Sequence, residues 1–298
     1  MPDPDTIAAP IRSWLFAPGN HMHHAAKAMA SVAHAVILDL EDAVAIAEKG
    51  AARADVRAAL AQHRANRYVR INALSTPFAF DDVAAIMPGK PDGIMLPKTE
   101  SADHVRILDW LLAQHERMLG LPEGTTQILP LLETARGVSH VDAIAVASRR
   151  VSQLAFGAGD FTLDLGLDWS RDEGELMSYR LAIVLASKAA GIHAPIDAAW
   201  VQVGDAEGMR SSARRSVDHG FQGKLCIHPS QVEIVHDAYR PDAAAIARAS
   251  AIVAAFEDAE AAGSAAIAVA GKLVDYPIYE SARRLLLDAR RSAAENLA

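Results

Sequence analysis

The sequence predicts a (β/α)8 barrel, a TIM barrel, followed by a C-terminal helical extension. Short apolar runs of strand length recur about every 25 to 45 residues, and stretches with helical periodicity lie between them. Eight such runs can be counted, and eight strands that alternate with helices close most naturally into a barrel. The length of 298 residues suits one barrel with a tail.

The predicted strands and helices alternate along the chain. The strands cover residues 11–17, 35–40, 67–72, 93–97, 127–132, 151–156, 196–201 and 223–227. Amphipathic helices are predicted over residues 43–63, 101–119, 138–149, 173–190 and 207–219. An open doubly wound sheet is the alternative, but no G-x-G-x-x-G motif follows the first strand.

The chain beyond the eighth strand exceeds what a barrel needs. A helix is predicted over residues 242–262, then a Gly/Ser break, a short Ala/Ile/Val run to Val274, and a last helix from about Pro277. We therefore divide the chain into a catalytic barrel, residues 1–240, and an extension, residues 241–298. The extension is expected to serve a subunit interface or to cover an active site.

Composition predicts a soluble, cytoplasmic protein. Hydrophobic residues make up 51% and charged residues 22%, and neither a secretion signal nor an apolar window of membrane-spanning length occurs, so no membrane contact is expected. The net charge of −8 argues against a nucleic-acid partner, although one local phosphate pocket remains compatible with it. The single cysteine, Cys226, excludes an internal disulfide, and we expect it to be a buried structural thiol.

Two carboxylates at neighbouring strand ends predict a metal site. Glu133 ends the fifth strand, and Asp160 follows the sixth after the small-residue turn Gly157, Ala158, Gly159. Strand C-termini of a barrel face its active site, and adjacent strands lie about 4.8 Å apart, so both carboxylates can reach one cation. Oxygen ligands with open water positions suit Mg²⁺ better than zinc. Taken alone, Asp160 could instead cap a helix.

Charged residues also end the second and third strands. Asp39, Glu41 and Asp42 repel one another unless a cation or hydrogen-bond donors compensate, the alternative being a solvated acidic turn that caps the next helix. Arg70 has an apolar neighbour on each side and can grip a carboxylate with two parallel hydrogen bonds. The alternative for Arg70 is that it only neutralises the Asp39 and Glu41 cluster.

Three further features of the sequence bear on its chemistry. Lys98, at the fourth strand end, is the one lysine that suggests a Schiff base, but we expect it to orient groups electrostatically. His228, after the eighth strand, is expected to line the pocket. The cluster His21, His23 and His24 lacks the spacing of three metal ligands. No P-loop, G-x-S-x-G or H-E-x-x-H motif occurs, which disfavours covalent nucleophilic catalysis.

The strand-end motifs resemble, in order, those of citrate lyase beta subunits in the HpcH/HpaI aldolase/citrate lyase family, which also includes malyl-CoA lyases. The matching segments are residues 12–19, 36–44, 69–72, 131–135, 156–160 and 220–231. The resemblance implies that Glu133 and Asp160 bind Mg²⁺, with Mn²⁺ as a substitute. It also implies that Asp39, Glu41 and Asp42 lie around the metal-bound waters.

The resemblance implies the substrates as well. Arg70 would hold the carboxylate of a 2-oxo acid, with Glu133 and the turn at residues 157–159 completing its site. Phe16 and Lys27 would contact the coenzyme A part of an acyl thioester. His23 replaces a more typical basic residue at a third position of that contact.

The tail carries a second resemblance. Residues 271–277 resemble the segment of malyl- and citramalyl-CoA lyases that brings a catalytic aspartate into the neighbouring subunit's site. Asp275 would then be the general acid/base, and the protein a homo-oligomer, either a trimer or a hexamer. The alternative is that Asp275 caps the last helix.

These inferences together predict a Mg²⁺-dependent carbon–carbon lyase. It would interconvert a malyl-, citramalyl- or citryl-thioester with an acyl-CoA and a 2-oxo acid. Two alternatives stay open: an aldolase acting on free 4-hydroxy-2-oxo acids, and the beta component of a citrate lyase whose thioester is on a carrier protein. A catalytically silent barrel is the alternative from another class.

Overall fold

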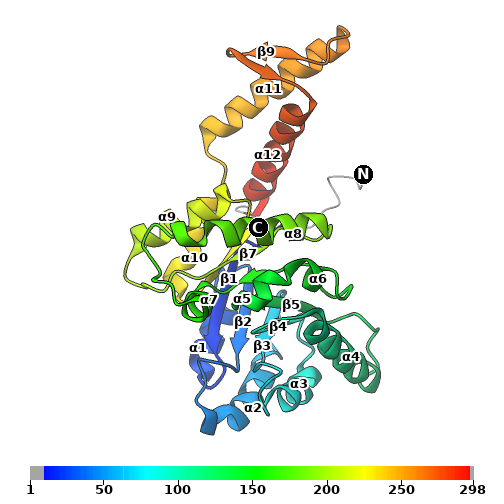
Figure 1. Cartoon of the computed structure of the whole chain (residues 1–298), viewed down its shortest axis with the longest axis vertical. Helices are drawn as coiled ribbons and strands as arrows, with labels where there is room; N and C mark the ends of the chain where they lie inside the picture. The colour runs from blue at the N-terminus through cyan, green and yellow to red at the C-terminus, as the bar shows by residue number, and fades with distance from the viewer. Residues whose placement is uncertain (1–9, 63, 296–298) are drawn as a thin grey trace. The chain divides into compact units, whose positions relative to one another are not determined.

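The computed structural model describes residues 10–62 and 64–295. The chain divides into two compact units, Ile11–Tyr239 and a second that begins at Arg240. In the first unit, eight parallel strands close into a barrel in the order β1 to β8 (Figure 1). The predicted TIM barrel is therefore confirmed.

All eight strands overlap the predicted apolar runs. The strands β6 and β7 pair with each other only through Ala155 and Ile196, and both are shorter than predicted: β6 begins later and β7 ends earlier. The strands are β1 Ser13–Pro18, β2 Ala35–Asp39, β3 Arg67–Arg70, β4 Gly93–Leu96, β5 Gln127–Leu132, β6 Ala155–Phe156, β7 Ile196–Asp197 and β8 Gly223–Cys226.

The helices of the first unit follow the strands and lie around the barrel (Figure 1). One prediction was wrong: residues 138–149 do not form one helix. Residues 138–139 end α5, residues 141–145 form α6 after His140, and residues 146–149 lie outside both helices. Gly137 and two valines lower the helix propensity there. The α-helices are α1 Met22–Met29, α2 Lys49–Ala59, α3 Ala79–Ile86, α4 Ala102–Met118, α5 Ala135–Ser139, α6 Val141–Ala145, α7 Ala158–Leu165, α8 Met177–Ala189, α9 Ala206–Asp218 and α10 Val232–Tyr239, with 3-10 turns at Ile46–Glu48, Met87–Gly89, Gly174–Leu176 and Pro229–Gln231.

Two apolar layers stabilise the barrel. The inner layer contains Trp14 and Tyr68, whose rings pack edge to face at 4.8 Å, together with Ile37, Leu131 and Leu225. The outer layer lies between the strands and the helices. Because alternate strand residues fill the interior, polar residues that end the strands collect at its C-terminal mouth.

Strand register brings the predicted polar residues side by side. Asp39 on β2 pairs with Arg70 on β3. Leu132 on β5 pairs with Phe156 on β6, and the next residue, Gly157, donates its N–H to the Leu132 carbonyl at 3.0 Å. Glu133 and the turn that leads to Asp160 therefore leave the sheet at the same level.

The second unit is a helical pair with a hairpin. Helices α11 (Ala243–Ala261) and α12 (Tyr276–Glu295) run side by side, and β9 (Ile267–Val269) and β10 (Lys272–Val274) form an antiparallel hairpin between them in sequence (Figure 1). The ring of Phe256 stacks on Tyr279 at 4.7 Å. The predicted helical extension is confirmed. In the parts of both units that the structure describes, the helices are too short or too polar to cross a membrane.

Candidate active site

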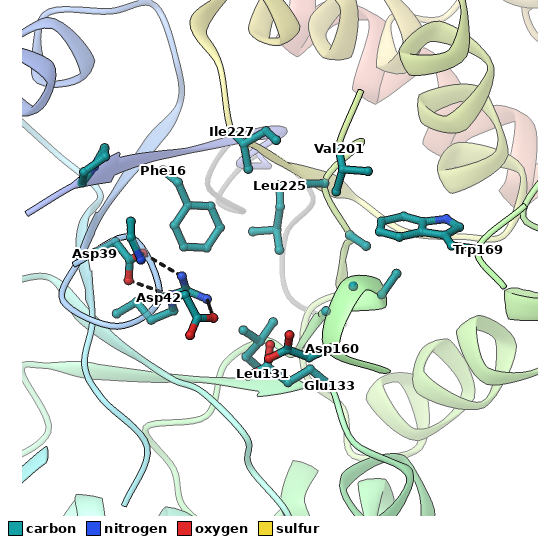
Figure 2. Close-up of a pocket in the computed structure, with 18 residues that line it drawn as sticks. Phe16, Asp39, Asp42, Leu131, Glu133, Asp160, Trp169, Val201, Leu225 and Ile227 are labelled. Carbon is teal, nitrogen blue, oxygen red and sulfur yellow. Dashed lines mark hydrogen bonds and ion pairs between the residues drawn. The ribbon is translucent and has the colours of Figure 1, made fainter. Parts of the chain in front are cut away.

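A cavity of about 410 Å³ lies at the C-terminal ends of the barrel strands. Its polar lining comes from the ends of β2, β3 and β5, the residues just after them and the start of α7. Its apolar lining comes mainly from β1, β5, β8 and the segments after β7 and α7. Figure 2 shows Asp39 and Asp42 on one side and Trp169 and Val201 on the other. The lining includes Phe16, Asp39, Asp42, Arg70, Leu131, Glu133, Gly157, Ala158, Gly159, Asp160, Trp169, Ala198, Ala199, Val201, Leu225 and Ile227.

Arg70 is held on the polar side by a forked ion pair. Its Nε and Nη2 donate to the two carboxylate oxygens of Asp39 at 2.7 and 2.6 Å, and its Nη1 lies 3.1 Å from Oε2 of Glu41. The guanidinium carbon also lies 4.9 Å from the ring centre of Phe16. Burial alone would lower the pKa of Arg70, but Asp39 raises it, so the group stays charged. Arg70 neutralises the acidic cluster and also lines the cavity.

Lys98 links two acidic segments. Its Nζ lies 2.6 Å from Oε1 of Glu41 and 3.1 Å from Oδ2 of Asp160. Burial would lower the pKa of Lys98, but its hydrogen bond to Glu41 raises it, whereas burial raises the pKa of Glu41. This geometry agrees with the electrostatic role expected of Lys98.

Glu133 is a buried carboxylate of the cavity, with 3% of its surface exposed. Its Oε1 accepts the backbone N–H of Lys98 at 2.8 Å, and Lys98 presents that N–H from a left-handed conformation with φ 46°. Burial raises the pKa of Glu133 to about 8, and Glu41 adds to the rise while Arg70 and Lys98 oppose it. A cation beside Glu133 would favour its ionised form.

Asp160 lies in the first turn of α7, where the helix begins at Ala158 without a side-chain cap. The first backbone N–H groups of a helix have no partner within it, so Ala158 and Gly159 can present donors to the cavity. The Asp160 side chain is 36% exposed, so water reaches it. The start of α7 therefore places backbone N–H groups next to the solvent-accessible carboxylate of Asp160.

The donor set fits a hard divalent cation. Two cations, Arg70 and Lys98, face five carboxylates in this cluster, namely Asp39, Glu41, Asp42, Glu133 and Asp160. Across the described residues no group of three or more His, Cys, Asp and Glu side chains is arranged to hold a metal. Glu133 and Asp160 would therefore need water or substrate oxygens as further ligands, which is the coordination Mg²⁺ prefers.

Several predicted residues lie away from the cavity lining. Lys27 and His23 are exposed on α1. His228 was predicted to line the pocket, which is wrong: its Nδ1 is bonded to Ser230, at 2.7 Å from the hydroxyl and 3.2 Å from the N–H, and it caps a 3-10 turn. Cys226 is buried, as expected.

Asp275 belongs to the second unit, where it precedes α12. Its Oδ1 accepts the N–H of Ile278 at 3.3 Å, and its carbonyl accepts the N–H of Tyr279 at 2.9 Å. This is the helix-capping geometry that the sequence offered as the alternative.

The apolar wall of the cavity was not predicted. Leu131 and Leu225 could have been found, because alternation along β5 and β8 points them into the barrel. Trp169, in the loop after α7, carries no periodic signal that places it at the site. Its indole contacts Glu173, whose partners Ser212 and Arg215 lie far along the chain.

Comparison with known proteins agrees with this geometry. The HpcH/HpaI aldolase/citrate lyase family model matches residues 12–229. Citrate lyase subunit beta of Leuconostoc mesenteroides is 36% identical over 92% of this chain and 92% of its own. The L-malyl-CoA/beta-methylmalyl-CoA lyase of Cereibacter sphaeroides is 34% identical over 98% of each chain.

Solved structures give the same result. Protein CitE of Mycobacterium tuberculosis, in complex with magnesium, acetoacetate and coenzyme A, is 34% identical, with a TM-score of 0.80 over 95% of this chain and 99% of that chain. The citrate lyase beta subunit of M. tuberculosis, complexed with oxaloacetate and magnesium, is 36% identical, with a TM-score of 0.66 over 78% of this chain. The chain therefore belongs to the HpcH/HpaI aldolase/citrate lyase family and is a carbon–carbon lyase.

Proposed function

We propose that this protein is a Mg²⁺-dependent lyase that interconverts a 3-hydroxyacyl-CoA with an acyl-CoA and a 2-oxo acid. The observation that carries the proposal is the convergence of Glu133, Asp160 and Arg70 on one cavity at the barrel mouth. Relatives that are named for citrate or malyl-CoA cleavage, and a solved relative that holds magnesium and coenzyme A, support it.

In this proposal Glu133 and Asp160 hold the metal ion, and Mn²⁺ can replace Mg²⁺. A bound divalent ion supplies Lewis-acid stabilisation of negative charge on oxygen. Asp39, Glu41 and Asp42 would lie around its water ligands, and Lys98, which contacts Glu41 and Asp160, would limit the net negative charge of the cluster.

The carboxylate of the 2-oxo acid would bind between the two donor sets of the cavity. Arg70 has further N–H groups beyond the two that Asp39 engages. The backbone N–H groups of Ala158 and Gly159, at the start of α7, attract an anion through the helix dipole. These donors would fix the carbonyl group at the reacting position.

Cleavage then needs proton transfers. A base removes the hydroxyl proton of the 3-hydroxyacyl thioester, and that oxygen becomes the carbonyl of the 2-oxo acid. The electron pair of the broken carbon–carbon bond forms the thioester enolate, which an acid protonates at carbon to give the acyl-CoA. We assign this enolate proton transfer to Asp275 of a neighbouring copy in a homotrimer or hexamer, with Phe16 and Lys27 contacting coenzyme A.

The test is an assay of the full-length protein with acetyl-CoA or propionyl-CoA and glyoxylate, pyruvate or oxaloacetate. Formation of a hydroxyacyl-CoA should require Mg²⁺ or Mn²⁺ and disappear in excess chelator. Full activity in chelator would refute the metal requirement. Cleavage of free 4-hydroxy-2-oxo acids alone would favour the aldolase, and turnover only of a carrier-protein thioester would favour a citrate lyase component.

Metal binding can be measured independently of turnover. Glu133→Ala and Asp160→Ala should each weaken Mg²⁺ binding in calorimetry by tenfold or more, because each removes an ionic ligand. Glu123→Ala removes a carboxylate that is 65% exposed outside the cavity and serves as the matched control. Equal Mg²⁺ affinity in all three variants would remove the proposed site.

A further inference from the structure

The side of the cavity opposite Asp39 and Asp42 is apolar and has no role in the proposed metal and carboxylate contacts. It is formed by Trp169, Val201 and the strand-end residues Leu225 and Ile227 (Figure 2). A substrate anchored by its carboxylate would direct its hydrocarbon part away from the charged side, because apolar groups gain free energy by leaving water.

Trp169 presents its hydrocarbon edge to this space. A Cβ atom at Gly159 would lie 3.8 Å from Cζ3 of Trp169, so the six-membered ring lies close to the turn before Asp160. The indole Nε1 lies 3.4 Å from Oε1 of Glu173, behind the cavity. In Figure 2 the ring projects from its loop into the cavity with its nitrogen at the distant end.

The loop that carries Trp169 is fixed by a buried carboxylate. Glu173 is 1% exposed and accepts hydrogen bonds from Arg180 at 2.9 Å, Ser212 at 2.8 Å and Arg215 at 2.9 Å. Its backbone is left-handed, with φ 54°. Because the Glu173 carboxylate is buried, these ion pairs and hydrogen bonds hold the loop in one arrangement.

The same network extends to the barrel. Nε of Arg180 donates to Asp197 on β7 at 2.9 Å, and Nζ of Lys224 on β8 lies 3.1 Å from the other oxygen of Asp197. Trp169 also packs against the outer core layer. The indole is thus a preset wall, connected through Glu173 and Arg180 to two barrel strands.

We propose that Trp169 sets the upper size of the hydrocarbon substituent that the enzyme accepts next to the reacting carbons. This inference rests on the proposed function and deepens it by assigning a specificity-determining residue. A rigid apolar wall discriminates by about tenfold or more for one additional methylene group. The substituent can belong to the 2-oxo acid or to the acyl-CoA, since both carry hydrocarbon chains beside the bond that forms.

Binding measurements on the full-length protein distinguish these two sources. One series contains glyoxylate, pyruvate, 2-oxobutyrate and 2-oxovalerate with saturating Mg²⁺, and the other contains acetyl-, propionyl- and butyryl-CoA. Wild type is compared by calorimetry with Trp169→Ala, Trp169→Phe and Trp110→Ala. Trp110 is 63% exposed on α4 and is the matched control for loss of a tryptophan.

Trp169→Ala should improve binding of the longer members of one series, relative to the shortest, by about tenfold, and the series that responds identifies the source. Trp110→Ala should leave both series unchanged. Trp169→Phe keeps an aromatic ring packed on the core and should change the relative affinity for the longer members by a smaller factor. This variant provides the test if Trp169→Ala does not fold.

Different results would refute the role of Trp169 and the proposed function. If wild type binds both series and turns them over but the size preference stays the same in Trp169→Ala and Trp169→Phe, Trp169 does not set the limit. If wild type binds neither series, the proposed function itself is refuted, and the role of Trp169 with it.

Discussion

Gly157 lies so close to Glu133 that a Cβ atom at position 157 would be 2.7 Å from both Cβ and Oε2 of that side chain. Real Cβ atoms do not approach so closely, so with any larger residue the Glu133 side chain or the turn at residue 157 must shift. Glu133 is fixed on its other side by the N–H of Lys98 at 2.8 Å. The position of a proposed metal ligand therefore depends on the absence of a side chain at residue 157.

The first prediction follows from this contact. Gly157→Ala should lower lyase activity and Mg²⁺ affinity by about a hundredfold, since a displacement of about 1 Å at a reacting site has effects of that size. Gly50→Ala is the control, because a Cβ atom there meets nothing within 4 Å. Steady-state kinetics and calorimetry on both variants test it. Unaltered Mg²⁺ affinity in a folded Gly157→Ala protein would contradict the prediction.

The second prediction concerns pH and the metal-free protein. The folded-state pKa of Glu133, about 8, exceeds its ordinary value of 4.5. Such a group stabilises the fold below pH 4.5, and this contribution is lost as the pH rises through 8, with a slope of at most about 1.4 kcal/mol per pH unit. Glu133→Gln removes this slope. In buffers from pH 5.5 to pH 7.5, the free energy of unfolding of Glu133→Gln should therefore increase relative to that of wild type as the pH rises.

Urea unfolding in chelator measures that difference. Glu123→Gln, on the surface, is the control and should follow the wild-type pH dependence. A difference between Glu133→Gln and wild type that stays constant across this pH range would mean that Glu133 does not titrate there. Added Mg²⁺ should reverse the effect by stabilising the ionised wild-type carboxylate.

The sequence predicts which residues end the strands, but not which side chains those residues contact. Apolar runs located all eight strands, and barrel geometry then placed Glu133, Asp160 and Arg70 at one mouth. The pairing of Arg70 with Asp39 was offered only as an alternative, because sequence shows charges and not the direction in which a side chain points. The contacts of Glu173 with residues 7 to 42 positions away follow no periodic pattern, so the sequence does not predict them.

The third prediction separates the charge of Lys98 from its backbone role. Lys98→Met should keep the N–H that Glu133 accepts but remove the ammonium group 3.1 Å from Asp160. Mg²⁺ affinity should then rise by a few-fold to about tenfold, a modest effect because Lys98 is 36% exposed and screened. Lys90 also has a left-handed backbone, with φ 52°, and is exposed, so Lys90→Met is a matched control. Weaker Mg²⁺ binding in Lys98→Met alone would show that the ammonium group supports the metal.

The fourth prediction concerns the buried network behind Trp169. Arg180 is fully buried and donates to Asp197 and Glu173, both at 2.9 Å. Arg180→Met would leave Glu173 with Arg215 and Asp197 with Lys224, so two buried carboxylates lose a partner, and the free energy of unfolding should fall by about 3–5 kcal/mol. Arg210→Met breaks an exposed pair and should cost less than about 1 kcal/mol. Equal losses in urea unfolding would show that burial does not decide the strength of these pairs.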